Sequence, residues 1–338
     1  MAEQKVLRRL AIIGAGSWGT ALAIVLAPRF EKVTLWVYEP DLAARMARTR
    51  ENDVFLPGFR LPQNVFVTPE LGPALSGSEV VLGVMPSHHA RGVYRAMLGY
   101  LDPSMVFVSA TKGIENGTHL RMTQVIESVL RERFQPKVAA LSGPTFAREI
   151  ARGDPAAVVI ASADEKVATT IQEAFSGPVL RLYRNPDVVG VELGAALKNV
   201  IAIGAGVCAG LGLGNNTLAA LITRGLAEIT RLAVALGAQP KTLAGLSGLG
   251  DLVLTCNGEL SRNRMVGIEL AKGRPLDDIT GSMRMVAEGI QTTFAAVELA
   301  RCNGIEMPIT TQMYAILKEG RSPRDAIREL MERTLKEE

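Results

Sequence analysis

The sequence predicts an α/β fold, with a mostly parallel sheet domain in residues 1–185 and an all-helical domain in residues 186–338. Three observations carry this prediction. A glycine-rich turn directly follows an apolar strand near the start of the chain, strand-like and helix-like runs alternate through the first half, and long apolar-periodic runs fill the second half. A length of 338 residues is sufficient for two domains.

The first strand and its glycine turn predict a nucleotide site. Leu7 to Ile13 is typical of a buried strand, glycines follow at Gly14, Gly16 and Gly19, and Thr20 to Leu26 is apolar and helix-like. In this Gly-x-Gly-x-x-Gly pattern, the first glycine makes the tight turn, the second admits a pyrophosphate and the third lets the helix pack closely on the strand. Because a helix N-terminus attracts phosphates, the motif indicates a Rossmann-like domain that binds NAD or NADP.

The second strand bears on the choice of cofactor. Val33 to Val37 predicts a strand that ends at Tyr38-Glu39. An acidic residue at this distance past the glycines can bond the adenosine ribose hydroxyls, so Glu39 favours NAD, although acidic turn residues are also common on an ordinary solvated surface. Arg48 and Arg50 are near enough in sequence to offer a 2′-phosphate site, which leaves NADP open.

Further strand-like runs complete the predicted sheet, and segments such as His89 to Leu101 and Leu120 to Phe134 are compatible with helices between them. This alternation predicts a mostly parallel sheet with helices on both faces. The strand-like runs are Val65 to Thr68, Val80 to Val84, Met105 to Ser109, Val138 to Leu141, Ala157 to Ala161 and Val179 to Tyr183.

Polar loops follow three of these runs, at residues 86–89, 110–113 and 142–145. Ligands of such sheets gather at the carboxyl ends of the strands, so these loops are candidates for binding groups. Lys112 is the one cation in its immediate neighbourhood. His88 and His89 are either proton donors or plain solvated surface.

The second half changes character after Asn185-Pro186, where we place the domain boundary because a residue before proline avoids the helical conformation. The apolar-periodic runs predict helices. They span Val188 to Leu211, Leu218 to Leu236, Arg264 to Lys272, Gln291 to Cys302, Thr310 to Lys318 and Pro323 to Lys336.

Lys198 is the most informative residue of this half. From Leu193 to Ala227 the only charged residues are Lys198 and Arg224, and the residues around Lys198 are apolar and small. Such a run indicates a helix packed on all sides. A buried ammonium is costly unless it is paired or loses its proton, which points to a functional lysine. The alternative is a side chain whose charged end reaches the surface.

Two further groups accompany Lys198. Asp251 ends the glycine-rich loop from Gly245 and is the only charged residue between Lys241 and Glu259, so it is either a helix N-cap or the partner of a buried cation. Ser261 is a candidate N-cap, and Arg262 and Arg264 open the following helix. A helix N-terminus beside a guanidinium is suited to phosphate, although a solvated basic turn has the same pattern.

The amino-acid composition argues against several classes of protein. The net charge of +3 and the absence of long basic blocks argue against nucleic acid. The three scattered cysteines and three histidines argue against a disulfide framework or a metal site, and they favour a cytoplasmic location. The basic residues before the apolar stretch from Leu10 to Ala27 imitate a signal peptide, but glycines interrupt that stretch. No membrane span is expected.

The motifs together resemble the NAD(P)-dependent glycerol-3-phosphate dehydrogenases of the bacterial type. The resemblance runs in order from about Leu10 to Met313, and several of its blocks are specific to that family. The blocks are Gly14 to Ala23, Ala110 to Gly113, Ser142 to Ala147, Leu197 to Ala202, Gly248 to Leu252 and Ser261 to Asn263.

The resemblance implies roles for individual residues. Lys198 accepts the proton of the substrate hydroxyl, and it forms the catalytic group with Asp251 and Lys112. The residues expected to bind the substrate are Lys112, Gly143, Thr145, Lys198, Asp251, Ser261, Arg262 and Asn263. Those expected to bind the dinucleotide are Gly14, Gly16, Ser17, Trp18, Gly19, Tyr38, Glu39, Lys112, Ala147, Arg262, Val286 and Glu288. Many relatives carry a basic residue in place of Tyr38, so a preference for NADP is in doubt.

The expected reaction is reversible hydride transfer between C2 of sn-glycerol 3-phosphate and C4 of the nicotinamide, giving dihydroxyacetone phosphate for glycerophospholipid synthesis. The resemblance also implies a homodimer. Burial lowers the pKa of a lysine and a nearby Asp251 raises it, and the sequence leaves the balance open. The sequence leaves two rival functions open. One is a dehydrogenase for a 3-hydroxy acid or a ketopantoate-like substrate, and the other is a nucleotide-sensing protein without turnover.

Overall fold

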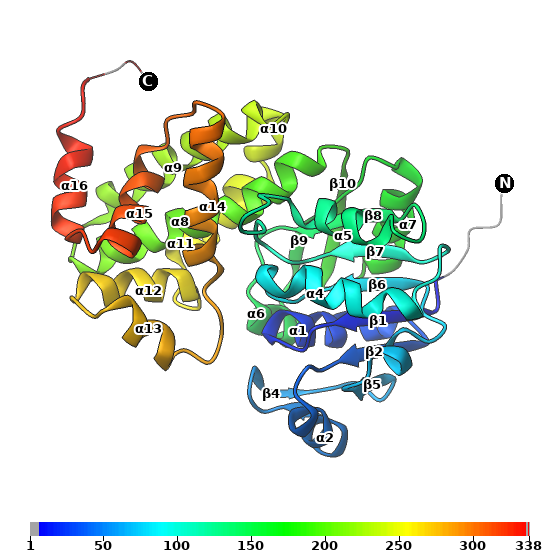
Figure 1. The fold of residues 1–338 in the computed structure, drawn as a ribbon. Helices are drawn as coiled ribbons and strands as arrows, with labels where there is room; N and C mark the ends of the chain where they lie inside the picture. Colours follow the sequence, from blue (N-terminus) through cyan, green and yellow to red (C-terminus); the bar gives the residue numbers. More distant parts are fainter. Residues whose placement is uncertain (1–6, 336, 338) are drawn as a thin grey trace.

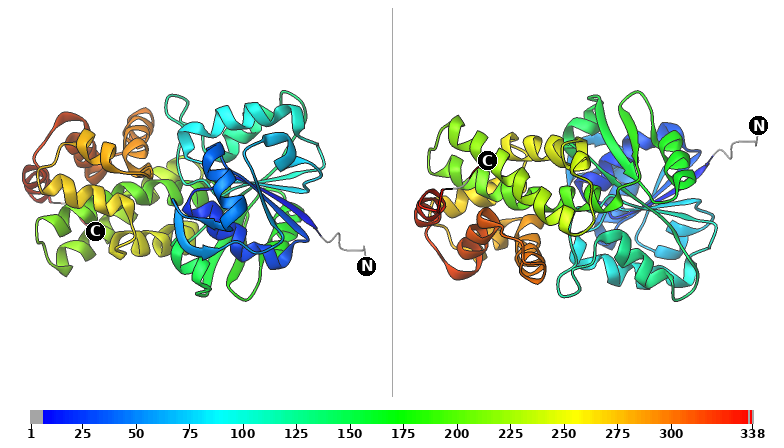
Figure 2. Two further views of the ribbon diagram at one scale, coloured as in Figure 1. Left: turned by 90° about the horizontal axis from the view of Figure 1, so that it is seen from below. Right: turned by 90° about the horizontal axis from the view of Figure 1, so that it is seen from above.

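The computed structural model describes residues 7–335 and 337, and it contains two lobes that lie side by side (Figure 1). The larger lobe holds the sheet, and the other lobe is helical, as the views in Figure 2 also show. Within the described residues the main sheet has eight strands. Their spatial order is β5 (Val65–Thr68), β2 (Lys32–Trp36), β1 (Arg9–Ile13), β6 (Val80–Gly83), β7 (Val106–Ser109), β8 (Lys137–Ser142), β9 (Ala156–Ala161) and β10 (Leu180–Asn185).

The prediction of a mostly parallel sheet is confirmed. Every neighbouring pair from β5 to β8 is parallel, as is β9 with β10, while β8 and β9 pair antiparallel. β3 (Glu51–Asn52) and β4 (Leu56–Arg60) form a separate antiparallel hairpin. Since β1, β2, β6, β7 and β8 run in one direction, the loops after them meet at one edge of the sheet, and this edge carries the predicted polar loops.

Helices cover both faces of the sheet, as the alternating pattern predicts. One apolar cluster joins the sheet to α1, α6 and α7, and a second joins its other face to α3, α4 and α5. The helices of this lobe are α1 (Ser17–Leu26), η1 (Ala27–Arg29), α2 (Pro40–Thr49), α3 (Leu71–Leu75), α4 (Ser87–Met97), η2 (Leu98–Tyr100), α5 (Met122–Leu130), α6 (Ala147–Arg152) and α7 (Glu165–Phe175).

The second lobe is built around α8, which contacts most of the other helices of the lobe. Its helices are α8 (Val188–Gly210), α9 (Asn215–Ala235), α10 (Pro240–Leu243), η3 (Leu246–Gly250), α11 (Asp251–Asn257), α12 (Arg262–Ala271), α13 (Leu276–Ser282), α14 (Glu288–Cys302), α15 (Pro308–Glu319) and α16 (Pro323–Met331). Among the described helices, α8 alone is long and apolar enough to cross a membrane, but 89% of its most apolar window is buried inside the fold. It is therefore the core helix of this lobe.

Two glycines bring α8 and α12 into close contact. A Cβ atom on Gly206 would lie 2.0 Å from the carbonyl oxygen of Arg264, and one on Gly267 would lie 2.0 Å from that of Ile203. No larger residue fits at either position without separating the helices. This contact places the N-terminus of α12 beside the Lys198 segment of α8.

Two expectations need correction. The loop predicted from Gly245 to Asp251 is a short π-helix, η3, whose turn leads directly into α11. The last helix ends at Met331, short of the predicted Lys336, and residue 336 lies outside the described residues. The other predicted helices and strands are present, with ends that differ by a few residues.

Candidate active site

The amine of Lys198 is buried, and two side chains bond it. Lys198 lies on α8 with 5% of its surface exposed. Its Nζ donates to Asp251 Oδ1 and to Thr255 Oγ1, both at 2.6 Å. The alternative in which the side chain reaches the surface is therefore wrong, and the prediction of a buried and paired lysine is confirmed.

Asp251 joins this amine to a second one. Its carboxylate is completely buried, and its Oδ2 atom accepts a 2.7 Å hydrogen bond from Lys112 Nζ. Lys112 also donates to the carbonyl of Gly143 at 2.9 Å and to Thr145 Oγ1 at 3.4 Å. Asp251 thus bridges two ammonium groups that come from different lobes.

The position of Asp251 decides between its two predicted roles. Gly250 occupies the N-cap position of α11, and Asp251 is the first residue of the helix. The N-cap interpretation is wrong, and the interpretation as partner of a buried cation is confirmed. Thr255 was not predicted as a site residue, and its hydroxyl also donates to the Asp251 carbonyl at 2.6 Å. Its spacing of one helical turn from Asp251 was the available signal.

Burial decides the protonation of Lys198. The pKa of Lys198 falls from 10.5 to about 8, chiefly because burial desolvates the ammonium and also because of the positive charge of Lys112. The carboxylate of Asp251 acts in the opposite direction without overcoming burial. The balance that the sequence left open is thereby resolved in favour of desolvation. A lysine with a pKa near 8 can both accept and donate a proton near neutral pH.

The N-terminus of α12 faces the same region with an unengaged cation. Ser261 caps this helix by accepting a 3.2 Å hydrogen bond from the backbone N–H of Arg264, as predicted. Within the described part of the chain, the guanidinium of Arg262 makes no hydrogen bond or ion pair, although Glu288 influences it electrostatically. Burial lowers its pKa. A partly buried guanidinium at a helix N-terminus is suited to a phosphate.

Asn263 is engaged within the fold. Its Nδ2 donates to Asn199 Oδ1 at 2.9 Å, and its Oδ1 accepts from the backbone N–H of Gly289 at 2.9 Å. The carboxamide therefore ties α8, α12 and the start of α14 together beside Lys198. These contacts fix the position of Arg262.

The glycine turn has the geometry that a dinucleotide requires. Gly14 has φ +117°, and a Cβ there would lie 2.6 Å from the carbonyl oxygen of Val84. A Cβ on Gly19 would lie 1.9 Å from the carbonyl oxygen of Gly14, so helix and strand pack closely. A Cβ on Gly16 would meet nothing within 4 Å. Since no side chain caps α1 at this end, Ser17 and Trp18 begin a helix whose N–H groups can face a pyrophosphate.

The end of β2 is exposed where the adenosine of a dinucleotide is expected. The Tyr38 side chain is 75% exposed and lies edge-on to Trp36, with 6.0 Å between ring centroids. Glu39 is exposed at the N-cap position of α2. Arg50 donates to the carbonyls of Leu61, Pro62 and Val65, so its guanidinium is already used within the fold. Of the two arginines that kept NADP open, only Arg48 is exposed.

Of the remaining predicted residues, Glu288 joins the two lobes. Glu288 opens α14, and its carboxylate accepts from the N–H and hydroxyl of Ser87 at 3.1 and 2.5 Å. Burial raises the pKa of Glu288. Val286 is 38% exposed, and Ala147 is the first residue of α6 and packs on the sheet core.

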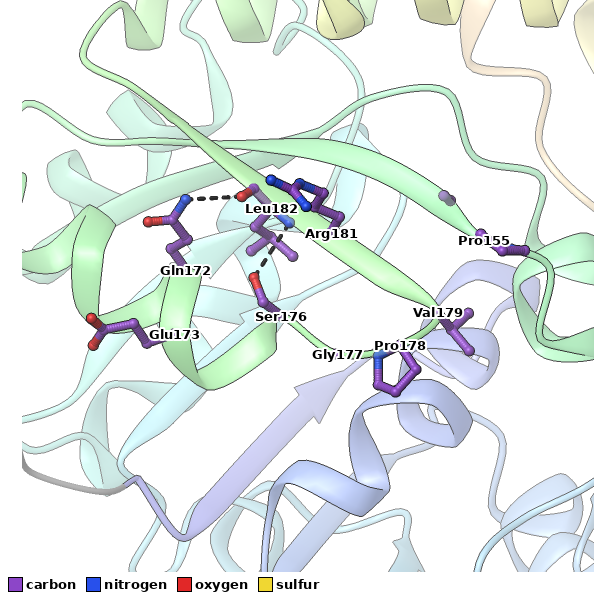
Figure 3. A pocket seen from close by; sticks show the side chains of 10 residues that line it. Pro155, Gln172, Glu173, Ser176, Gly177, Pro178, Val179, Arg181 and Leu182 are labelled. Carbon is purple, nitrogen blue, oxygen red and sulfur yellow. Dashed lines mark hydrogen bonds between the residues drawn. The ribbon is translucent and has the colours of Figure 1, made fainter.

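Two other features lie outside the predicted site. His88 and His89 are exposed, with ring centroids 4.0 Å apart. A pocket of 590 Å³ lies beside α7 and β10 (Figure 3), and its lining includes no residue predicted for the site. There, Gln172 and Ser176 are hydrogen-bonded to the Leu182 backbone. No group of three or more metal-ligating side chains occurs among the residues that the structure describes.

Comparison with known proteins covers both lobes. Residues 9–168 match the model of the NAD-dependent glycerol-3-phosphate dehydrogenase N-terminus, and residues 187–328 match that of its C-terminus. The chain is 61% identical to glycerol-3-phosphate dehydrogenase [NAD(P)+] of Koribacter versatilis over 97% of this chain and 98% of that one. It is 54% identical to the enzyme of the same name from Geobacter sp. strain M21, over 98% of each chain.

A solved structure agrees with these relatives. The crystal structure of glycerol-3-phosphate dehydrogenase from Coxiella burnetii superimposes with a TM-score of 0.93 at 39% identity, covering 97% of this chain and all of that one. The resemblance inferred from the sequence motifs is confirmed over both lobes. The chain belongs to the NAD-dependent glycerol-3-phosphate dehydrogenase family.

Proposed function

We propose that Lys198, Asp251 and Lys112 form the catalytic centre of this enzyme, with Lys198 as the group that exchanges a proton with the substrate. The chain catalyses reversible hydride transfer between sn-glycerol 3-phosphate and NAD(P)+, giving dihydroxyacetone phosphate and NAD(P)H. The observation that carries the proposal is the buried Lys198 amine, held at 2.6 Å by Asp251 and by Thr255.

The glycine turn fits the dinucleotide. Gly16 leaves open space, and the uncapped N-terminus of α1 offers N–H groups to phosphate oxygens. We assign the pyrophosphate to Gly14, Gly16 and Gly19 with Ser17 and Trp18. Bound at this edge, the nicotinamide supplies the position that accepts or returns the hydride of C2.

Lys198 has the capacity that the proton transfer needs. An ammonium has three N–H donors, and Asp251 and Thr255 take two of them. The third donor is left for the substrate oxygen at C2. In the oxidation, the neutral amine accepts the hydroxyl proton, and in the reduction the ammonium returns it. Asp251 holds the amine in place, since its two oxygens are fixed by two lysines.

The charges of the centre suit an anionic substrate. Two ammonium groups share one carboxylate, so the cluster carries a net positive charge when both lysines are protonated. We assign the substrate phosphate to Arg262 at the N-terminus of α12, near Ser261 and Asn263. Gly143 and Thr145 hold Lys112 in position and complete the wall of the site. Binding energy from the phosphate then aligns C2 with the amine and the cofactor.

We assign the adenosine of the dinucleotide to Tyr38 and Glu39, which follow β2. Val286, Glu288 and Ala147 are assigned to the rest of the dinucleotide. Either NAD or NADP serves the family. Because Arg50 is engaged with backbone carbonyls, we propose that Glu39 accepts hydrogen bonds from the adenosine ribose hydroxyls and that the enzyme prefers NAD over NADP. The domain boundary at 185/186 is proposed from the end of β10 at Asn185 and the start of α8 at Val188.

We propose a homodimer in the cytoplasm. Four exposed apolar side chains on the helical lobe support an interface. They are Leu249 of η3, Val253 of α11, Leu260 of the loop between α11 and α12, and Met265 of α12. All three cysteines are free, which suits a reducing compartment. Light scattering of Val253→Asp against the unchanged protein tests the interface, and an unaltered dimer mass would remove this surface from it.

Replacement of Lys198 tests the catalytic proposal. Lys198→Ala removes the proton acceptor, so we expect turnover to fall by at least about a thousandfold while NADH still binds. Lys137→Ala, on the exposed start of β8, is the matched control and keeps full activity. NADH oxidation with dihydroxyacetone phosphate and NADH fluorescence are the two readouts. Near-normal turnover of Lys198→Ala refutes the proposed role.

A further inference from the structure

We propose that Glu192 is a positioning residue: it anchors the loop of residues 111–121 to α8 and thereby keeps Lys112 on Asp251 opposite Lys198. This inference rests on the proposed function of Lys198, and it assigns a role to a buried carboxylate outside the predicted site. Glu192 lies on α8, the helix that carries Lys198, and 7% of its surface is exposed.

Glu192 binds the far end of the loop. Its Oε1 accepts a 2.8 Å hydrogen bond from the backbone N–H of Thr123, and its Oε2 accepts one of 2.6 Å from the Thr123 hydroxyl. Oε2 also forms an ion pair with Arg121. Thr123 lies in the first turn of α5. The Glu192 carboxylate, from the helical lobe, therefore accepts a hydrogen bond from one of the free N–H groups at the N-terminus of a helix in the sheet lobe.

The β-bridge in this loop connects the anchored end to the segment that carries Lys112. Arg121 pairs with Ile114 in an isolated β-bridge, which brings the end of the loop to within two residues of Lys112. Ile114 is 1% exposed and belongs to the apolar cluster of the helical lobe, together with Leu193 and Leu197 of α8. The backbone on both sides of the loop is therefore fixed to α8, and Lys112 reaches Asp251 from a constrained position.

Other contacts hold the middle of the loop without reaching α8. Arg91 of α4 forms an ion pair with Glu115, Asn116 donates to Gln291 of α14 at 2.6 Å, and His119 contacts Glu298 of α14 at 2.6 Å. These contacts involve partly exposed side chains. Unlike these three contacts, the Glu192 anchor uses a buried carboxylate on the helix that carries Lys198, so it defines the Lys112 geometry most directly.

The charges around Lys198 give this geometry a measurable consequence. Burial lowers the pKa of Lys198, Asp251 raises it, Lys112 lowers it, and Cys256 raises it least. When the loop loses its anchor, Lys112 withdraws from Asp251 and the pKa of Lys198 rises. Oxidation of sn-glycerol 3-phosphate needs the neutral amine, so the pH at which kcat reaches half its maximum moves upward.

The test compares Glu192→Gln with Glu228→Gln in the full-length enzyme. Glu228 is the matched control: it is 2% exposed and caps α15 by accepting from Ile309 N–H and Thr310 N–H, far from the loop in sequence. We expect Glu192→Gln to raise the kcat midpoint by about 0.5 pH unit or more and to lower kcat at pH 7 at least about threefold. Glu228→Gln lowers the melting temperature but leaves the midpoint in place.

Two further comparisons keep the proposal open to refutation. If Glu192→Gln does not fold, Arg121→Met removes the same ion pair from the loop side, and it must raise the midpoint in the same direction. An unchanged midpoint in the folded variant overturns the proposal, as does an equal shift in Glu228→Gln. An inactive Lys198→Ala beside an unshifted Glu192→Gln rejects this inference alone, whereas an active Lys198→Ala rejects the proposed function.

Discussion

Replacement of Asp251 by asparagine removes the one negative charge between two ammonium groups. Asp251 Oδ1 lies 2.6 Å from Lys198 Nζ, and Oδ2 lies 2.7 Å from Lys112 Nζ. The carboxylate is completely buried, so little solvent screens either contact. In the Asp251→Asn variant the shape of the side chain is kept, but its stabilisation of the Lys198 ammonium is lost.

The size of the effect follows from the geometry. An opposite charge at close range shifts a pKa by about 1–3 units, and contacts this short and this buried justify a value of about 2 units. The pKa of Lys198 then falls from about 8 to about 6. At pH 7 the protonated fraction drops from about 0.9 to about 0.1, so the reduction of dihydroxyacetone phosphate slows at least about tenfold from loss of the proton donor alone.

The assay is the pH profile of kcat in both directions. For oxidation, the neutral amine is the active form, so a lower pKa moves the rising limb to lower pH, opposite to the shift expected for Glu192→Gln. Asp187→Asn is the control for general destabilisation, because Asp187 is a buried carboxylate that caps α8 through Gly190. A rising limb of Asp251→Asn that stays in place or moves to higher pH refutes the reasoning.

Three further changes test other parts of the site. Gly16→Ala should leave the melting temperature nearly unchanged, since Gly16 has φ −64° and an added Cβ meets no protein atom within 4 Å, but it should weaken NADH binding at least about tenfold by fluorescence titration; unaltered binding would contradict the assignment of this space. Arg262→Ala should raise the KM for dihydroxyacetone phosphate about 10- to 100-fold, with Arg148→Ala on the exposed surface as control, and an unchanged KM would exclude the phosphate role. Tyr38→Arg should shift the ratio of kcat/KM values towards NADPH by about tenfold, because it adds a cation for the 2′-phosphate; a ratio that stays constant would place the adenosine elsewhere.

Local sequence patterns were sufficient to predict the parts of the fold that are formed by residues close together in the chain. The strand, glycine turn and helix at the start of the chain were predictable because only glycine at positions 14 and 19 permits this close packing. Lys198 and Asp251 were predictable because each is an isolated charge in an uncharged run, and such charges need partners when they are buried. The sequence left Asp251 open as either a helix N-cap or the partner of a buried cation, and the structure pairs it with Lys198.

Contacts between the lobes were harder to predict, since they join residues far apart in the chain. Glu192 immediately precedes the apolar run that singled out Lys198, and extending the same argument by one residue would have included it. Its partner Arg121 lies in the other lobe, and no local pattern connects them. The antiparallel pairing of β8 with β9 was also not visible, because strand direction depends on the path of the connection rather than on the strand residues.

Direct titration of the Lys198 amine tests the central claim. Nitrogen and carbon NMR of labelled lysines follows the protonation of each side chain, and the Lys198 signal is the one that disappears in Lys198→Met. The structure predicts a midpoint at about pH 8 for this signal. A midpoint close to the ordinary value of 10.5 would mean that the amine is solvated, and it would contradict the assignment of Lys198 as the proton-exchanging group.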